Sequence, residues 1–511
     1  MKAVRPTTRN SINHYLIVRS ITALCSPHWS ARAFLILSSL AATACSVGPN
    51  YRKTEPNAPA RWNRLETAST VTDAGAAGNL SQWWRRLNDP LLSQLVDEAQ
   101  RQSLDLRKAQ ARLREARARL GVASAGRYPS LDASVSAGRS GSIVGASTPA
   151  SSTATISGDQ FNAGFDASWE LDLFGGVRRG VEAAQADQES AVASLDDARV
   201  SLVAEVAKSY VELRSLQIRL DIARTNLASQ SETLQLTELR AQAGLVNAQD
   251  VEQARSNREQ TLAQIPSLET SLAEAEHRLD ILLGKAPGTS NARFSAVGTL
   301  PEIPSRVAVG IPADTLRQRP DVRAAERKLA AETARVGVAK AARYPSFKLS
   351  GSIGLEALAQ TATGTSTGLS YSLLGGITAP IFNAGRLKNQ VEAQDAVREQ
   401  AQVTYEQAVL TALQDVENAL VALARNRERS DALARAAEAS SAAAQLARQR
   451  YGAGVIDFQS VIDTERTVLS VQDNLASTRA DGVLALIRLY KALGGGWSQE
   501  TQPRPADKSG T

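Results

Sequence analysis

The chain is poor in the residues that most often build catalytic and metal sites. Its 511 residues include only two cysteines, three histidines and one methionine. Beyond residue 44 the single histidine is His277, which lies in a helical pattern, and a Ser-His-Asp triad would have to use it. A helix-surface imidazole is the simpler interpretation. Because the sequence also has no Gly-rich phosphate loop followed by Lys-Ser or Lys-Thr, it predicts neither an enzyme nor a metal or nucleotide site.

An excess of one charge is also missing once the N-terminus is set aside. The formal net charge is +6, and residues 1–44 contribute +5 of it because they hold five basic side chains and no acid. The remaining chain is therefore near neutral. It has no basic patch interleaved with aromatic residues, so the high isoelectric point does not indicate a nucleic-acid partner.

Residues 1–44 have the pattern of a secretory signal peptide. Basic residues precede an apolar run over 33–44, and this run ends in small side chains. The run is too short for a membrane-spanning helix, which needs about 20 apolar residues. We therefore expect the mature protein to begin at Cys45.

Cys45 is then the only thiol of the mature chain, because Cys25 lies within the signal peptide. An unpaired thiol is a liability in an oxidising compartment unless it is modified. Residues 42–45 resemble a bacterial lipobox, although Ala42 stands where leucine is usual. We predict that Cys45 carries a covalent lipid and that the chain has no other cofactor; the alternative is a free thiol at a frayed terminus. Ser46, in place of an aspartate, favours the outer membrane over the inner one.

The remaining chain contains an internal duplication. Three pairs of segments are similar in sequence: 127–130 with 343–346, 118–123 with 334–339, and 243–251 with 453–461. Each half exceeds about 200 residues, which is too long for the unit of a solenoid. The predicted organisation is an extended N-terminal segment over 45–88, a first repeat over 89–290, a linker over 291–312, a second repeat over 313–497 and a disordered tail over 498–511.

Most of each repeat has a helical pattern, and apolar residues between 203 and 220 follow a heptad seam. The pattern predicts helices over 90–126, 175–243, 247–285, 313–342, 385–451 and 457–493. Gly244 and Gly454 lie in the tight turns that follow the two longest helices. A helix of about 70 residues is roughly 100 Å long. Such helices fit the wall of a helical tube better than a compact domain.

Each repeat also contains a predicted β-hairpin, within 129–173 and 346–381. Apolar and polar residues alternate along its strands, as in transmembrane barrel strands, although half-buried strands of a soluble sheet alternate too. Long loops rich in serine and glycine are expected over 138–160 and 357–367. Four strands cannot close a barrel in lipid. Two copies would give about 8 strands around a filled interior, whereas three would give about 12 and leave a lumen, so the pattern predicts at least a trimer.

Several segments together resemble one known family. They are Cys45–Tyr51, Trp83 with Trp84, Arg319–Glu326, the two glycine turns and Tyr490–Trp497. In this order and spacing they resemble the TolC-like outer-membrane factors, and within them the OprM/NodT-type lipoproteins of drug-efflux systems. Trp83 and Trp84 could lie at a membrane interface, but we expect them to pack against the helices.

The resemblance implies a mainly α fold with a transmembrane β-barrel part. A homotrimer would form a barrel of about 12 strands, four from each chain, on a long α-helical barrel. The protein would be anchored by lipid in the outer membrane and extend into the periplasm. It would be the passive exit duct of a tripartite efflux pump, with a periplasmic adaptor protein and an inner-membrane RND-type pump as partners. The alternatives are a duct for type I protein secretion and a periplasmic coiled-coil adaptor or scaffold.

The resemblance also implies roles for residues near the two turns. The predicted adaptor contacts are Gly244, Leu245, Val246, Gly454, Val455 and Ile456. Asp463 matches an acidic position that would form a ring around the pore, although a solvated aspartate on a helix face is the alternative. Asp457 is a second candidate for this gate, and Tyr451 matches an aromatic residue that latches the closed state. Ile456 stands where some relatives have the basic partner of that latch.

Overall fold

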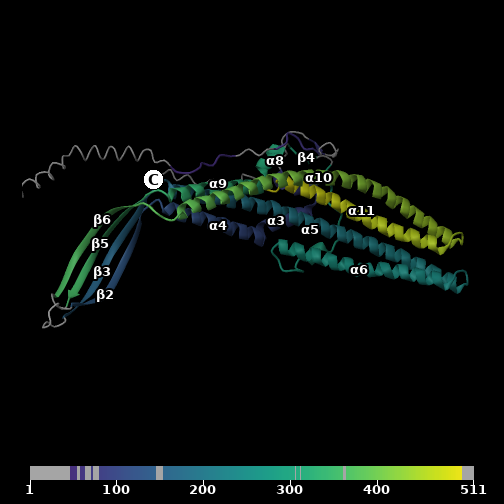
Figure 1. Ribbon diagram of the computed structural model, residues 1–511. Coiled ribbons are helices and arrows are strands. Elements are labelled where there is room, and N and C mark those ends of the chain that lie inside the picture. Colours follow the sequence, from purple (N-terminus) through teal and green to yellow (C-terminus); the bar gives the residue numbers. More distant parts are fainter. Residues whose placement is uncertain are drawn as a thin grey trace, which may run out of the picture. The chain divides into compact units, whose positions relative to one another are not determined.

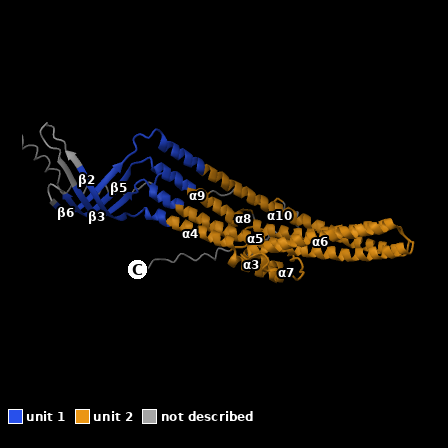
Figure 2. Cartoon of the chain, turned by 90° about the horizontal axis from the view of Figure 1, so that it is seen from below, with its two compact units in different colours: residues 1–51, 121–183, 332–397 blue, residues 52–120, 184–331, 398–511 orange. Residues whose placement is uncertain are grey.

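The computed structural model describes residues 46–53, 58–63, 71–72, 80–144, 154–304, 307–310, 312–360 and 364–497. The predicted signal peptide, Cys45 and the predicted tail over 498–511 lie outside these residues. The chain divides into two compact units, coloured separately in Figure 2. Unit 1 comprises 1–51, 121–183 and 332–397, and unit 2 comprises 52–120, 184–331 and 398–511.

Unit 1 contains a four-stranded antiparallel sheet in the order β2-β3-β5-β6 (Figure 1). Its strands are β2 (Ser130–Val144), β3 (Ala154–Leu171), β5 (Ser346–Gln360) and β6 (Gly364–Thr378). The four predicted strands are therefore present, but the predicted loops over 138–160 and 357–367 are too long. Gly138 pairs with Gln160, and Ala359 pairs with Thr365. Pairing with a neighbouring strand has outweighed the weak β-propensity of these segments.

The register of the strands gives the sheet one apolar and one polar face. Phe165, Ile353 and Tyr371 lie opposite one another across β3, β5 and β6, whereas Asp166 and Ser352 pair on the other face. Tyr371 is 83% exposed, and most apolar side chains of this face are also exposed. Among the described residues, the outer edges of β2 and β6 have no strand partner. The sheet thus lacks both a covering layer and a closed edge.

The long helices come in matched pairs. α5 (Gly176–Gln242) and α10 (Arg386–Gly452) each have 67 residues, and α6 (Ala248–Leu282) and α11 (Phe458–Ala492) each have 35. Each of the four helices begins and ends within three residues of its predicted bounds. Among the described residues, none of the helices combines the length and the apolar composition that a membrane-spanning helix requires.

Two of the predicted helices are each divided into two, so the prediction of continuous helices was wrong there. The expected helix over 90–126 is divided at Ser103 into α3 (Pro90–Gln102) and α4 (Leu104–Ala125). The expected helix over 313–342 is divided at Arg319 into α8 (Pro312–Gln318) and α9 (Pro320–Ala341). Pro320 explains the second break, because a proline disfavours the helical conformation of the residue before it. Ser103 has φ −54° and ψ 131°, which is an extended conformation.

Unit 2 also has small elements in the regions expected to be an extended segment and a linker. They are η3 (Leu80–Leu87), α7 (Asn291–Phe294) and the parallel pair β1 (Val71–Thr72) with β4 (Val307–Ala308). Trp83 and Trp84 are fully buried in the core of this unit. The ring of Trp83 stacks on Tyr490 with centroids 5.1 Å apart. Packing against the helices, rather than a membrane-interface position, is therefore confirmed for both tryptophans.

Candidate functional site at the hairpin tips

The two turns between the long helices have the same backbone geometry. Gly244 and Gly454 have φ of +74° and +72°. At the first turn the N–H of Leu245 donates to the carbonyl of Arg240 at 2.9 Å, and at the second Val455 donates to Arg450 at 2.9 Å. These bonds form a Schellman motif, which ends a helix on a left-handed residue that is usually glycine. The left-handed glycine and the hydrogen bond across it therefore place each turn where the sequence predicts it.

The helix after each turn begins with a polar side-chain cap. Asn247 Oδ1 accepts a hydrogen bond from the N–H of Asp250 at 2.9 Å. Asp457 Oδ1 accepts from the N–H of Ser460 at 3.0 Å and from its hydroxyl at 2.6 Å. The Ser460 hydroxyl and N–H hold the pKa of the Asp457 carboxyl below its usual value. Asp457 thus starts α11, and its predicted role at a gate stays a prediction.

The apolar residues after the two glycines have different surroundings. Leu245 is 67% exposed and Val455 is 70% exposed. The next residue of each turn, Val246 or Ile456, packs against a buried cluster instead. Of the six predicted contact residues, Leu245 and Val455 are therefore the two whose apolar side chains face solvent in a single chain.

Tyr451 lies in that buried cluster, which we call the tip cluster. Its members are Ala254, Ala447, Tyr451, Phe458, Val461 and Ile462. Tyr451 is 2% exposed, and its ring lies 5.3 Å from the ring of Phe458 between centroids. The tip cluster joins the α5/α6 hairpin to the α10/α11 hairpin because Ala254 comes from α6.

A basic partner of Tyr451 is present, but it comes from the other repeat. The guanidinium carbon of Arg240 on α5 lies 4.5 Å from the centroid of the Tyr451 ring, within cation–π range. Arg240 Nη1 also donates a hydrogen bond to the Tyr451 carbonyl oxygen. Arg240 was not among the predicted residues, because the family resemblance places the basic partner after Gly454, where Ile456 stands. A signal existed, since Arg240 precedes Gly244 by the same spacing as Arg450 precedes Gly454.

A buried carboxylate makes a second connection between the hairpins. Glu465 on α11 is 5% exposed, and its Oε1 accepts a hydrogen bond from Thr233 Oγ1 on α5 at 2.6 Å. Asn257 of α6 lies beside it, with Nδ2 3.5 Å from Oε2. Burial raises the pKa of the Glu465 carboxyl, and this effect outweighs the opposing influences of the Thr233 hydrogen bond and the Arg448 charge.

Asp463 lies two residues before Glu465 but faces solvent. Its Oδ1 accepts a hydrogen bond from Gln459 Nε2, one helical turn earlier, at 3.0 Å. A ring of aspartates requires further copies of the chain, so this role of Asp463 stays a prediction.

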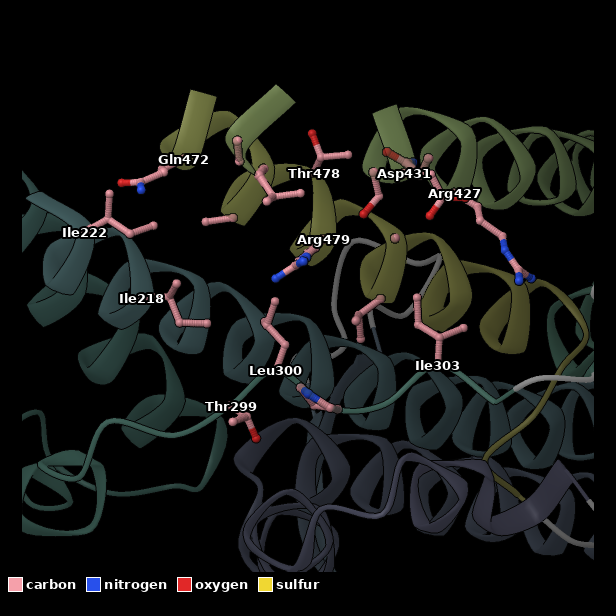
Figure 3. Close-up of a pocket in the computed structure, with 18 of the residues that line it drawn as sticks. Ile218, Ile222, Thr299, Leu300, Ile303, Arg427, Asp431, Gln472, Thr478 and Arg479 are labelled. Carbon is pink, nitrogen blue, oxygen red and sulfur yellow. The ribbon is translucent and has the colours of Figure 1, made fainter. Parts of the chain in front are cut away.

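A separate cleft of about 1170 Å³ lies elsewhere in unit 2. It is bounded by α5, α10, α11 and the segment between Val297 and Pro304. Figure 3 shows Ile218 and Ile222 of α5 across from Arg479 of α11. None of the predicted tip residues lines this cleft. Among the described residues there is no group of three or more His, Cys, Asp or Glu that could hold a metal ion.

Comparisons with known proteins agree in both sequence and fold. The family model described as "Outer membrane efflux protein" matches residues 95–285 and 311–495, which include both turns and all four long helices. Nodulation protein T of Rhizobium leguminosarum bv. trifolii is 33% identical over 463 residues, covering 90% of this chain and 96% of that protein. The pyoverdine export outer membrane protein OpmQ of Pseudomonas putida is 32% identical over 478 residues, covering 92% and 98%.

Solved structures of similar proteins are outer-membrane channels. The channel OprN aligns with a TM-score of 0.80 at 36% identity, covering 89% of this chain and 100% of that one. The open state of the MtrE channel of Neisseria gonorrhoeae aligns with a TM-score of 0.73 at 28% identity, covering 90% and 100%.

Proposed function

Because the chain belongs to the outer membrane efflux protein family and is an outer-membrane channel of an efflux pump, we propose that three copies of it form one passive exit duct for small molecules. The family is one of channels rather than of enzymes. OpmQ is named for the export of pyoverdine, and this favours small molecules over secreted proteins as the cargo.

The observation that carries this proposal is the two-faced sheet of unit 1. Its apolar face is exposed and its two outer strands have no partner among the described residues. A lipid bilayer does not tolerate an open sheet edge, because the unpaired backbone groups cannot reach water. Three such sheets joined edge to edge would remove every edge and would leave a polar lumen in a barrel of about 12 strands. Lipid would then cover the apolar face, and the face with Asp166 and Ser352 would line the lumen.

Contacts between the two hairpins at the tips would hold the duct closed. Arg240 and Glu465 both connect the α5/α6 hairpin to the α10/α11 hairpin. Separating the hairpins would break both connections, so a closed population is favoured until a partner binds the open one more tightly. Leu245 and Val455 offer exposed apolar contacts for a periplasmic adaptor protein, and an inner-membrane RND-type pump would supply the energy.

Asp463 would add a charge barrier at the same end. Three exposed carboxylates around a pore would attract cations and hinder large or anionic solutes. We expect Asp463→Ala to raise the single-channel conductance or the sensitivity of cells to large antibiotics. If neither quantity changes, Asp463 is only a solvated residue on a helix face.

The lipid anchor is proposed at Cys45. The residues that follow it are held close to the sheet, since the N–H of Val47 donates to the carbonyl of Phe174 at 3.1 Å and Phe174 lies just after β3. A lipid on Cys45 would therefore start near the end of a proposed membrane strand. Cys45→Ala should abolish metabolic labelling with palmitate, and labelling that persists would exclude this anchor.

The duct itself can be tested with purified protein. Reconstitution into a planar lipid bilayer should give discrete conductance steps, and an electrophoresis gel of unheated sample should show a trimer. The circular dichroism spectrum should contain both helix and strand. A protein that stays monomeric and gives no conductance would contradict the proposed function.

A further inference from the structure

The two β-hairpins begin with the same strand register and the same side-chain hydrogen bond. In the first hairpin Ser130 pairs with Ser168, and its hydroxyl donates to the carbonyl of Ser168 at 3.3 Å. In the second hairpin Ser346 pairs with Thr378, and its hydroxyl donates to the carbonyl of Thr378 at 3.4 Å. Ser346 is therefore the counterpart of Ser130, and Thr378 is the counterpart of Ser168. The same spacing separates the two turn glycines, Gly244 and Gly454, as separates Ser168 and Thr378.

This correspondence distinguishes two kinds of boundary. The inner boundary, where the first repeat meets the second within one chain, is formed by β3 and β5. There Ala167 lies opposite Gly351, and Ser168 lies opposite Ser350. The outer boundary is formed by the counterparts of these two strands. The free edge of β6 corresponds to β3, and the free edge of β2 corresponds to β5. A single chain cannot close the outer boundary.

Glycines next to the inner boundary are tightly covered. A Cβ atom on Gly337 of α9 would lie 2.9 Å from Cγ of Arg179 on α5, and a Cβ atom on Gly48 would lie 2.5 Å from Cα of Gly337. A Cβ atom on Gly175, just before α5, would lie 2.8 Å from the hydroxyl oxygen of Ser46. Only glycine fits at these positions without a shift of the neighbouring backbone or side chain.

The counterparts of these glycines at the outer boundary are uncovered. Gly121 of α4 is the counterpart of Gly337, and Gly385, just before α10, is the counterpart of Gly175. A Cβ atom on either would meet nothing within 4 Å. Val135 of β2 is 86% exposed and Ile377 of β6 is 69% exposed. The outer boundary thus has the shape of the inner one but lacks its other half.

We propose that a second copy of the chain closes the outer boundary with the register of the inner one. By the correspondence, β6 of one copy pairs antiparallel with β2 of the next, with Ile377 opposite Val135 and Thr378 opposite Ser134. The start of α10 in one copy, at the Arg179 counterpart Asn389, packs over Gly121 of the next. This assignment rests on the proposed function, in which three copies form one duct, and adds the register in which β6 of one copy pairs with β2 of the next.

The register keeps the two faces of the sheet continuous. Ile377 and Val135 both belong to the apolar face, and Thr378 and Ser134 both belong to the polar one. A slip of one residue would put apolar side chains into the lumen. A slip of two residues would preserve both faces and move the partners by about 6.8 Å, so the test has to exclude it.

Cysteine cross-linking can test this register. One double variant carries Ile377→Cys with Val135→Cys, and the other carries Thr378→Cys with Ser134→Cys. In adjacent pairs of an antiparallel ladder the Cα atoms are alternately about 5.5 and 4.5 Å apart, and both distances are within reach of a disulfide. The slip controls combine Ile377→Cys with Ala133→Cys or with Ala137→Cys, and the four single variants control for other thiols.

We expect covalent trimers on a denaturing, non-reducing gel from at least one of the two double variants. The band should disappear with reductant and should be absent from the slip controls. A covalent trimer from a slip control would overturn the proposed register. The register would also be wrong if neither double variant gave a covalent trimer although light scattering shows that both are trimeric. If light scattering shows no trimer in the parent protein, the proposed function fails instead.

Gly121 gives an independent measurement. The Cβ atom of Gly121→Leu meets nothing within 4 Å in the chain, so the strand and helix content of the variant should match the parent protein. In the proposed assembly the same side chain meets the neighbouring copy, so the trimer should dissociate at a lower temperature. A trimer with unchanged heat resistance would show that this face lies outside the contact between copies.

Discussion

The contact between Arg240 and Tyr451 should set a measurable resistance to opening of the duct. Arg240→Ala removes the cation–π contact, worth about 0.5–2 kcal/mol at a partly buried site. It also removes a hydrogen bond from a charged donor, worth about 1.5–3 kcal/mol. Because one side chain makes both contacts, the two values do not simply add, and we expect a loss of about 2–3 kcal/mol. That loss corresponds to a shift of roughly 30- to 150-fold from closed towards open.

Single-channel recording without an adaptor measures this shift directly. Arg240→Ala should spend far more time in high-conductance states than the parent protein, and cells that carry it should become sensitive to large antibiotics. Arg240→Lys keeps the charge but loses the planar guanidinium, so its effect should be intermediate. Arg450→Ala is the matched control, because Arg450 occupies the same place in the other hairpin and its side chain is exposed.

Two results would contradict a role of the Arg240–Tyr451 contact in closing the duct. If Arg240→Ala conducts like the parent protein, the contact with Tyr451 does not hold the hairpins together. If Arg450→Ala opens the duct as much as Arg240→Ala, the cause is the loss of a positive charge from a helix C-terminus in general.

Two further predictions concern the same tips. Burial raises the pKa of the Glu465 carboxyl above the ordinary 4.5. The folded state therefore holds the carboxyl proton more tightly than the unfolded chain does. The tip should lose stability as pH rises from about 4.5 through the raised pKa. Glu465→Gln should flatten that dependence in the hydrogen exchange of α5 and α11, and an unchanged slope would contradict it. Gly454→Ala forces alanine to φ +72° and should cost about 1–2 kcal/mol in thermal unfolding. Gly452→Ala, at the last residue of α10, should instead stabilise by about 0.5–1 kcal/mol, and equal effects of the two would contradict our account of the turn.

The alternation of apolar and polar residues predicts which face of the sheet each side chain occupies, but it does not predict where the strands end. The alternation of apolar and polar residues assigns Phe165 and Asp166 to opposite faces, because successive side chains of any strand point to opposite sides. It does not locate the last paired residue. Ser140 and Gly158 have a loop-like composition, yet they pair with each other, because the backbone hydrogen bonds of a ladder do not depend on side chains.

Of the two breaks in the helices, one could be predicted from the sequence and the other could not. The break before Pro320 could have been predicted from the sequence, because proline restricts the preceding residue wherever it occurs. Ser103 carries no such local signal. Its N–H still bonds to the carbonyl of Ala99 at 2.9 Å, so the last hydrogen bond of α3 is kept although Ser103 itself is extended.

The duplication, the approximate bounds of the four long helices, the two glycine turns and the alternation of the four strands could all be predicted from the amino-acid sequence. Each of these depends on interactions between residues a few positions apart, or on a pattern repeated along the chain. The contacts of Arg240 with Tyr451, 211 residues later, and of Thr233 with Glu465, 232 residues later, could be seen only in the folded chain. Such partners depend on how each long helix is rotated about its axis, and that rotation is set by packing between the hairpins and not by local propensity.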